Sequence, residues 1–172
     1  VEGCQVVGFV GTSAESVAKT KQALGELFGF SGEGYTSVEE MFTAARPDIV
    51  TIASPPDCHY EHVLACAKHR TSALCEKPLV WYEDREPEEM IALAQEMVEK
   101  MDAAALVSAV NTQYVAALEP YFELCERMGI KRQAPRSMFM QIDSRGRRGP
   151  VSYEDIWRDL GSHPVSVMMA FC

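Results

Sequence analysis

Two short segments of this chain carry side chains that could do chemistry at one place. They are Ser54-Pro55-Pro56-Asp57-Cys58-His59 and Cys75-Glu76-Lys77-Pro78, and each follows a short apolar run typical of a buried strand. A helix between two parallel strands brings both strand ends to the same edge of a sheet. Proline disfavours the helical region for Lys77, so this lysine must leave its strand extended. We therefore expect the Lys77 ammonium to lie in a cleft at that edge.

Asp159 and His163 form a second candidate pair. They are four residues apart, so a helical turn would place both side chains on one face. A carboxylate that orients an imidazole is a common way to prepare a general acid or base, because histidine titrates near neutral pH. The same spacing also occurs in surface and capping pairs, so the pair gains meaning only together with the other motifs.

The elements that position these side chains alternate between strands and helices. Strands are predicted at about 5–10, 48–53, 72–75 and 106–110, with helices between them. This alternation indicates right-handed βαβ units and hence an α/β fold with a parallel sheet. Beyond these strands the texture changes, and an alternating run at 137–143 predicts a half-exposed strand of a different sheet.

Two helix starts carry capping signals. A capping box is expected at Thr12 with Glu15, and another at Ser37 with Glu40. The first lies in the turn Gly11-Thr12-Ser13, directly after the first predicted strand.

The composition excludes several kinds of partner. The net charge of -9 repels nucleic acid and anionic membrane surfaces. No run reaches the roughly 18 apolar residues of a membrane-spanning helix. The six cysteines show no C-x-x-C pair, which indicates reduced thiols of a cytoplasmic protein.

The predicted helix at 59–69 contains His59, His62, Cys66 and His69, which raises the question of zinc. The first and last histidines would lie about 15 Å apart along a helix. One helix cannot place four ligands around a single ion at about 2 Å. We therefore predict no metal site.

Four motifs, in this order, resemble the Gfo/Idh/MocA family of oxidoreductases. They are Ala53-Ser54-Pro55-Pro56-x-x-His59, Glu76-Lys77-Pro78, Asn111-x-x-Tyr114 and Asp159-x-Gly161-x-His163. The resemblance covers Val6 to about Ala170. It implies an enzyme that uses NAD or NADP to oxidise or reduce sugars, polyols or related carbonyl compounds. It also implies a Rossmann domain followed by an α/β domain with a large open sheet.

The resemblance implies a role for each matching residue. Lys77 would lie near the nicotinamide ribose and the reacting oxygen, His163 would donate and accept the proton, and Asp159 would set the tautomer of the imidazole. The expected cofactor contacts, besides Lys77, are Gly11, Thr12, Ser13, Ser54, Pro55, His59, Glu76 and Asn111. The chemistry agrees, because hydride transfer from an alcohol carbon needs a base and a cation that stabilises the alkoxide.

The chain begins almost directly on a strand and stops on an apolar stretch, so we interpret it as an internal fragment of a longer protein. Residues 1–115 would be a partial dinucleotide-binding domain, and 116–172 the start of a domain for substrate binding and oligomerisation. A homo-oligomer is expected at full length. The G-x-G-x-x-G turn of the fingerprint is absent, so Val6 to Val10 would be the second strand. The missing first strand should leave a gap in the sheet.

The choice of cofactor depends on the turn after that strand. An acidic residue there would bind the ribose 2′-hydroxyl and favour NAD. Gly11, Thr12 and Ser13 instead offer room, hydroxyls and a helix N-terminus, so the sequence favours NADP, although Glu15 lies close by. Two alternatives to an active enzyme stay open. One is a non-catalytic relative that binds a dinucleotide or a sugar derivative, and the other is an inactive truncated remnant.

Overall fold

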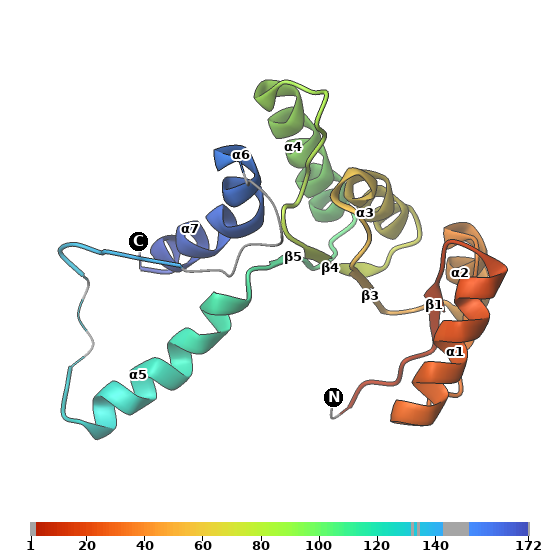
Figure 1. Ribbon diagram of the computed structural model, residues 1–172, viewed down its shortest axis with the longest axis horizontal. Helices are drawn as coiled ribbons and strands as arrows, with labels where there is room; N and C mark the ends of the chain where they lie inside the picture. The colour runs from red at the N-terminus through yellow and green to blue at the C-terminus, as the bar shows by residue number, and fades with distance from the viewer. Residues whose placement is uncertain (1–2, 132, 134, 143–151, 172) are drawn as a thin grey trace.

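The computed structural model describes residues 3–131, 133, 135–142 and 152–171, and strands alternate with helices along its first two thirds (Figure 1). The strands are β1 (Gly8–Val10), β2 (Glu33–Tyr35), β3 (Ile49–Ile52), β4 (Ser72–Glu76) and β5 (Ser108–Asn111). The helices among them are α1 (Ala14–Phe28), α2 (Val38–Ala45), the short 3-10 helix η1 (Pro56–Cys58), α3 (His59–Lys68) and α4 (Pro87–Ala103). The last third contains the 3-10 helix η2 (Gln113–Ala117), α5 (Leu118–Arg127), α6 (Tyr153–Ile156), the π-helix η3 (Trp157–Gly161) and α7 (Ser162–Met169).

The strand pairs of the described residues are parallel, which confirms the α/β prediction, but the strands form two sheets. β1 pairs with β2, and β3, β4 and β5 pair in that order. A doubly wound Rossmann sheet has the strand order 3-2-1-4-5-6. In this numbering, β2 and β1 take positions 3 and 2, and β3, β4 and β5 take positions 4, 5 and 6. Within the part of the chain that the structure describes, no strand occupies position 1. The sheet is therefore interrupted where the sequence predicts the gap, and Ile49 on β3 is 63% exposed.

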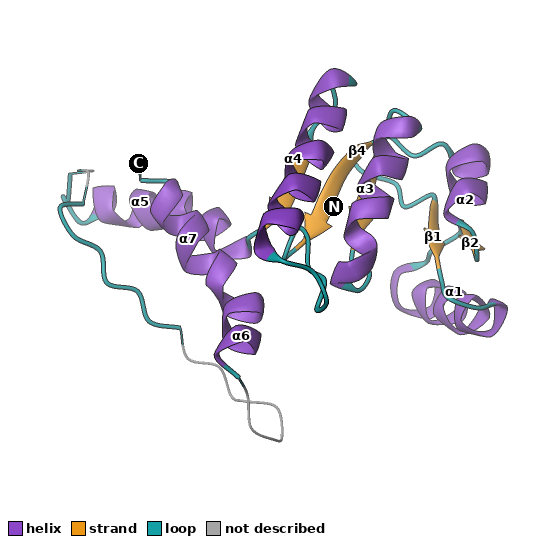
Figure 2. Cartoon of the chain, turned by 90° about the horizontal axis from the view of Figure 1, so that it is seen from above, coloured by secondary structure: helices purple, strands orange, loops and turns teal. Residues whose placement is uncertain are grey.

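The buried core lies between the three-stranded sheet and one layer of helices. Its members are Met41, Phe42, Ile52, Val63, Cys66, Ala73, Cys75, Met97 and Met101. Figure 2 shows α3 and α4 packed side by side along β4. The rings of Phe42 on α2 and His69 after α3 stack with centroids 4.6 Å apart. Because α2 follows β2 and α3 follows β3, this contact ties the two sheets together.

The five cysteines that the structure describes are free thiols. Burial raises the pKa of both Cys66 and Cys75 to about 12, so these two thiols stay neutral at physiological pH. They pack in the core, where a neutral thiol behaves as a small apolar group.

Ser37 is the N-cap of α2 as predicted, and its hydroxyl accepts a hydrogen bond from the Glu40 amide, which is one half of a capping box. The N-cap of α1 is shifted by one residue. The box before α1 uses Ser13 and Ser16 instead of Thr12 and Glu15, because Ser13 is the residue with extended backbone whose hydroxyl reaches the Ser16 amide. The turn Gly11-Thr12-Ser13 therefore ends in the cap itself.

Within the last third of the chain, α7 packs against η2 and η3. The ion pair of Asp159 with Lys77 joins this third to the rest of the molecule. The strand predicted at 137–143 is wrong for 137–142, and residue 143 lies outside the described residues. Residues 137–142 have no strand partner in the described part of the chain, and a strand needs one to satisfy its backbone.

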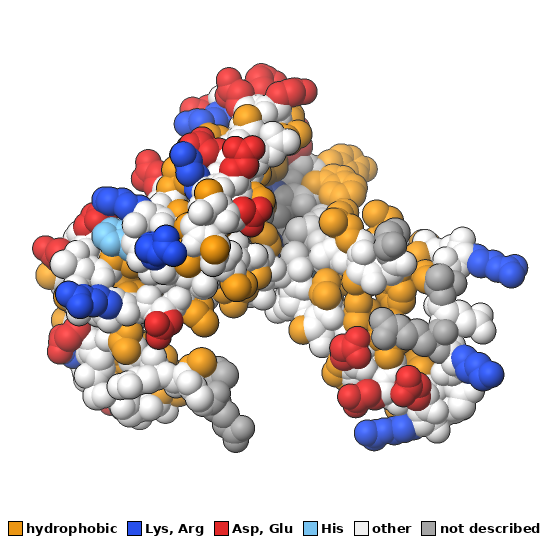
Figure 3. All heavy atoms as spheres, turned by 180° about the vertical axis from the view of Figure 1, so that it is seen from behind, with side chains coloured by type: hydrophobic (Ala, Val, Ile, Leu, Met, Phe, Trp, Pro, Cys, Tyr) orange, Lys and Arg blue, Asp and Glu red, His pale blue; other side chains and the backbone are white. Residues whose placement is uncertain are grey.

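Seen from behind, the molecule is hollowed between its two ends (Figure 3). The domain boundary proposed at 115 falls inside η2 and stays a prediction. Among the described residues, no helix has the length and apolar character needed to cross a membrane.

Candidate active site

The carboxyl ends of β4 and β5 bring the first candidate residues together. The register pairs Glu76 with Asn111, the last residues of the two strands. Asn111 Nδ2 donates a hydrogen bond to Glu76 Oε1, and the backbone amide of Lys77 donates to Glu76 Oε2 at 3.3 Å. Glu76 therefore fixes the backbone from which the Lys77 side chain starts.

Lys77 connects the sheet to the last third of the chain. Its Nζ lies 2.6 Å from Asp159 Oδ1 and 2.6 Å from the Asp159 carbonyl oxygen. The Lys77 side chain is 18% exposed, so this ion pair is partly shielded from water. An ammonium has three donors. Two are used by Asp159, and one is left for another acceptor.

His163 is almost completely buried, at 4% exposure, on the first turn of α7. Its ring packs edge-on against Tyr114, with centroids 4.7 Å apart and planes at 86°. Its Nδ1 has no hydrogen-bond partner among the described residues, and neither has the buried hydroxyl of Ser162. Buried polar atoms without partners are rare in folded proteins, so these two point to a ligand.

Several charges act on His163. Burial lowers its pKa, the positive charge of Lys77 lowers it further, and the negative charges of Asp159 and Glu76 raise it. The net shift is downward, which favours a neutral imidazole that can accept a proton. The sequence associates Asp159 with His163. The structure makes Asp159 the partner of Lys77, while its charge still reaches His163.

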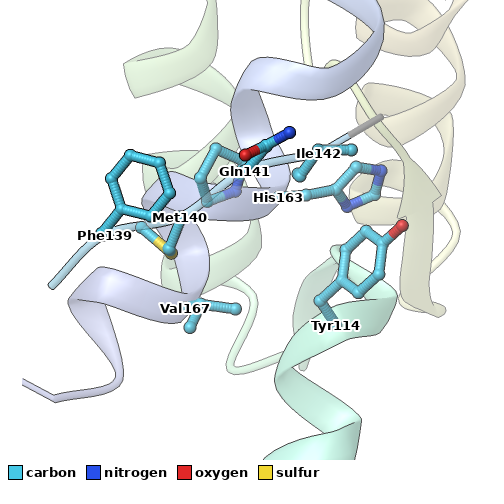
Figure 4. A pocket seen from close by; sticks show the side chains of 8 residues that line it. Tyr114, Phe139, Met140, Gln141, Ile142, His163 and Val167 are labelled. Atoms are coloured by element: carbon cyan, nitrogen blue, oxygen red, sulfur yellow. The ribbon is translucent and has the colours of Figure 1, made fainter. Parts of the chain in front are cut away.

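A pocket of about 490 Å³ opens beside His163. It is lined by Tyr114, Phe139, Met140, Gln141, Ile142, His163, Pro164 and Val167. In Figure 4 the rings of His163 and Tyr114 lie next to one another, and Val167 lies lower on the wall. A pocket of this size suits a small molecule. His163 was selected from the sequence, and Tyr114 could have been selected from its motif with Asn111. No sequence signal marked the remaining lining residues as part of a site.

Gly161 allows close packing in the helical turn that carries Asp159 and His163. A Cβ on Gly161 would overlap the ring of Trp157, at the other end of η3. Asp159 lies in the middle of the π-helix η3, and π-helical turns often occur at functional sites. Gly161 itself is buried.

The loop after β3 holds Ser54, Pro55 and His59. Ser54 Oγ lies 3.0 Å from His62 Nδ1. Burial is the main cause that lowers the pKa of His62, which favours a neutral ring that accepts this hydrogen bond. The His59 ring is 1% exposed, beneath the loop surface. No cluster of three or more metal-ligating side chains occurs in the described residues.

Gly11, Thr12 and Ser13 lie at the carboxyl end of β1, in the two-stranded sheet, whereas Lys77 and Asn111 belong to the loops of the three-stranded sheet. A Cβ on Gly11 would lie 2.8 Å from Ser16 Oγ and 2.8 Å from Val17 Cγ2, so the turn requires glycine. Glu15 pairs with Lys19 at 2.7 Å, and both side chains are exposed.

These residues fit the nicotinamide end of a dinucleotide. The unpartnered Nδ1 of His163, the remaining donor of Lys77 and the amide of Asn111 are suitable groups around a reacting carbon and a ribose. The glycine-rich turn that seats a pyrophosphate would follow the strand at sheet position 1.

Comparison with known proteins gives a consistent picture. The model of the Gfo/Idh/MocA proteins, described as an oxidoreductase family with an NAD-binding Rossmann fold, matches residues 2–108. The D-glucoside 3-dehydrogenase of Escherichia coli K12 is 37% identical over 57 residues, which are 33% of this chain and 16% of that enzyme.

Several solved structures have a similar fold. The oxidoreductase yvaA of Bacillus subtilis has a TM-score of 0.64 at 16% identity, over 95% of this chain and 51% of that protein. The WlbA dehydrogenase of Bordetella pertussis, solved with NADH and UDP-GlcNAcA, has a TM-score of 0.56 at 17% identity, over 73% of this chain and 32% of that protein. The myo-inositol 2-dehydrogenase of Lactobacillus plantarum has a TM-score of 0.56 at 15% identity, over 75% and 34% of the two chains. The chain thus spans a third to a half of the length of these structures.

Proposed function

This chain belongs to the Gfo/Idh/MocA family of oxidoreductases with an NAD-binding Rossmann fold, and from this premise we propose that its site transfers a hydride between a nicotinamide cofactor and a hydroxyl-bearing carbon. The proposed substrate is a sugar, a polyol or a related hydroxy or keto compound. The observation that carries the proposal is the buried His163, whose unpartnered Nδ1 lies beside a pocket and close enough to Lys77 to feel its charge.

The nicotinamide supplies hydride acceptance and donation when it is bound. In the oxidation direction, the His163 ring takes the hydroxyl proton, because the buried ring is kept neutral. The remaining donor of Lys77 stabilises the developing alkoxide. Asp159 holds the ammonium in place through two contacts. Burial of His163 and Lys77 strengthens these charge interactions by excluding water.

For the rest of the cofactor we propose contacts from Ser54, Pro55, Glu76 and Asn111 at one sheet, and from Gly11, Thr12 and Ser13 at the other. A preference for NADP over NAD is part of this proposal, because Glu15 is paired with Lys19 and leaves the turn without a free carboxylate. The homo-oligomer and the cytoplasmic location also stay proposals.

The experiment is a turnover assay with NAD and NADP against a panel of sugars and polyols. His163→Asn keeps the size of the side chain but removes proton transfer near neutral pH. We expect turnover to fall by about 100- to 10,000-fold. Glu99→Gln, at an exposed side chain of α4, is the control and should leave turnover unchanged. Equal activity of the His163 variant and the parent would exclude His163 as the base.

A non-catalytic role is the second candidate, because the pocket beside His163 could hold a ligand without any chemical step. Under this alternative the chain would bind a dinucleotide or a sugar derivative without turnover. NADH fluorescence distinguishes the non-catalytic role from the enzyme. Binding without any turnover on the panel would support the non-catalytic role, and binding with turnover would support the enzyme.

A further inference from the structure

His59 touches both loops of the three-stranded sheet that carry candidate residues. Its Nδ1 lies 2.9 Å from the carbonyl oxygen of Pro78, and its Nε2 lies 2.9 Å from the carbonyl oxygen of Ser54. Pro78 directly follows Lys77, and Ser54 opens the loop after β3. The ring is therefore a bridge between two segments that are 24 residues apart in sequence.

The chemistry of the contacts explains why a histidine is used here. Carbonyl oxygens only accept hydrogen bonds, so each contact needs an N–H from the ring. A neutral imidazole donates to one carbonyl, and a doubly protonated imidazole donates to both. The side chain is 1% exposed, so an unmet contact cannot be replaced by bulk water. The two ring nitrogens let one side chain reach both loops at once.

The groups around the ring include other ionisable side chains. His62 lies one turn further along α3, and the charge of His59 acts on it. Glu76 and Lys77 come from the loop whose carbonyl the ring contacts. Lys77 is thus held from three sides, by Glu76 at its amide, by Asp159 at its Nζ, and by His59 one residue further on.

We propose that His59 is a positioning residue that clamps the two loops together and so sets the place of Lys77. This assigns His59 an indirect part in cofactor binding, because its ring nitrogens face the protein. The link from the clamp to cofactor binding rests on the proposed function, because that function gives Lys77 its role. The clamp itself is a property of the chain without ligand.

The test is amide hydrogen exchange of the chain without cofactor, measured by NMR in the loops 54–58 and 77–81. His59→Leu removes both contacts and should speed exchange in both loops by about tenfold. The amide of asparagine lies near the place of Nδ1, and that of glutamine near the place of Nε2. His59→Asn should therefore protect only 77–81, and His59→Gln only 54–58.

This divided rescue separates a clamp from a side chain that merely fills space. His69→Gln is the matched control, because His69 contacts Glu39 and stacks on Phe42 away from both loops. If His59→Leu does not fold, the asparagine and glutamine variants decide the matter. Equal exchange of the two loops in both variants, or unchanged exchange in a folded leucine variant, would overturn the clamp. Because no cofactor or substrate is used, failure of the turnover assay does not affect this result.

Discussion

At the scale of single residues, the charges of Lys77 and Asp159 act on the pKa of His163. Lys77 and Asp159 form an ion pair next to His163, and the two charges shift the pKa of its ring in opposite directions. Burial has the largest influence, and it disfavours the charged ring. A base that must be neutral to accept a proton gains from this arrangement, because it stays neutral at pH values where a solvated histidine begins to take up a proton.

The acid limb of the pH–rate profile tests this arrangement. The rate of oxidation is lost as the pH falls through the pKa of His163, and that pKa is lowered, so the limb should lie below the usual value of about 6.5. Lys77→Ala removes a charge that lowers the pKa, so the limb should move to higher pH. Asp159→Asn removes a charge that raises it, so the limb should move to lower pH. Profiles of kcat/KM measure both shifts.

The same variants differ in rate. Lys77→Ala should lower turnover by roughly 100-fold or more, as for the loss of an electrostatic stabiliser, with a smaller change in cofactor affinity. Lys100→Ala is the control, because this exposed lysine lies in the last turn of α4. Limbs that move in the same direction in both site variants would contradict the opposing influence of the two charges.

At the scale of elements, the turn from η3 into α7 carries both Asp159 and His163 and depends on one small residue. Gly161 packs directly under the Trp157 ring, so any side chain there must displace the ring or the helix. The loop after β4 also contacts this turn. Arg158 Cζ lies 5.6 Å from the centroid of the Trp81 ring, and Arg158 Nη2 lies 2.6 Å from Asp155 Oδ1. The last third of the chain is thus joined to the loop after β4.

We expect Gly161→Ala to lower the free energy of unfolding by about 1–3 kcal/mol, the usual cost of overpacking a close contact. Gly25→Ala is the matched control. Gly25 lies inside α1, where an added Cβ meets only the Phe30 carbonyl oxygen at 3.8 Å. Alanine there should raise stability by about 0.5–1 kcal/mol. Urea unfolding of both variants gives the comparison, and a Gly161→Ala variant as stable as the parent would show that the ring moves without cost.

At the scale of the whole molecule, the sheet is divided between β1 and β3. The two sheets hold together through their helices, chiefly through Phe42 and His69 and the ion pair of Lys68 with Glu39 at 2.7 Å. Side chains of Lys68 and His69 lower the pKa of Glu39 through hydrogen bonds. The ion pair is exposed, so most of the support between the sheets comes from Met41 and Phe42, which are buried in the core.

A strand at position 1 should therefore stabilise the molecule. We expect an apolar, β-branched strand with a glycine-rich turn, fused ahead of Val1, to raise the free energy of unfolding by at least about 2 kcal/mol, since each buried valine or isoleucine contributes about 1.5–3 kcal/mol. NADH affinity should rise as well, because such a turn offers amides to the pyrophosphate. A glycine–serine extension of equal length is the control. Equal effects of the two extensions would show that the edges of β1 and β3 do not accept a strand.

Much of the architecture follows from local patterns in the sequence. The alternation of apolar runs and amphipathic helices specifies parallel βαβ units, because side-chain periodicity and crossover handedness are local properties. The same patterns indicate the place of Lys77 at a strand end, the cap at Ser37 and the gap at strand position 1. Four motifs in one order, and neither the Lys77 motif nor the spacing of Asp159 and His163 alone, selected these residues for a candidate site.

Only the tertiary structure decided how the selected residues meet. Asp159 contacts Lys77, which lies 82 residues earlier, and no local spacing could reveal that pair. The burial of His59 between two carbonyl oxygens and the pocket wall at Phe139 to Ile142 likewise depend on segments that pack together from distant parts of the chain. The failed strand at 137–142 has the same origin, since an alternating pattern becomes a strand only where a partner edge satisfies its backbone.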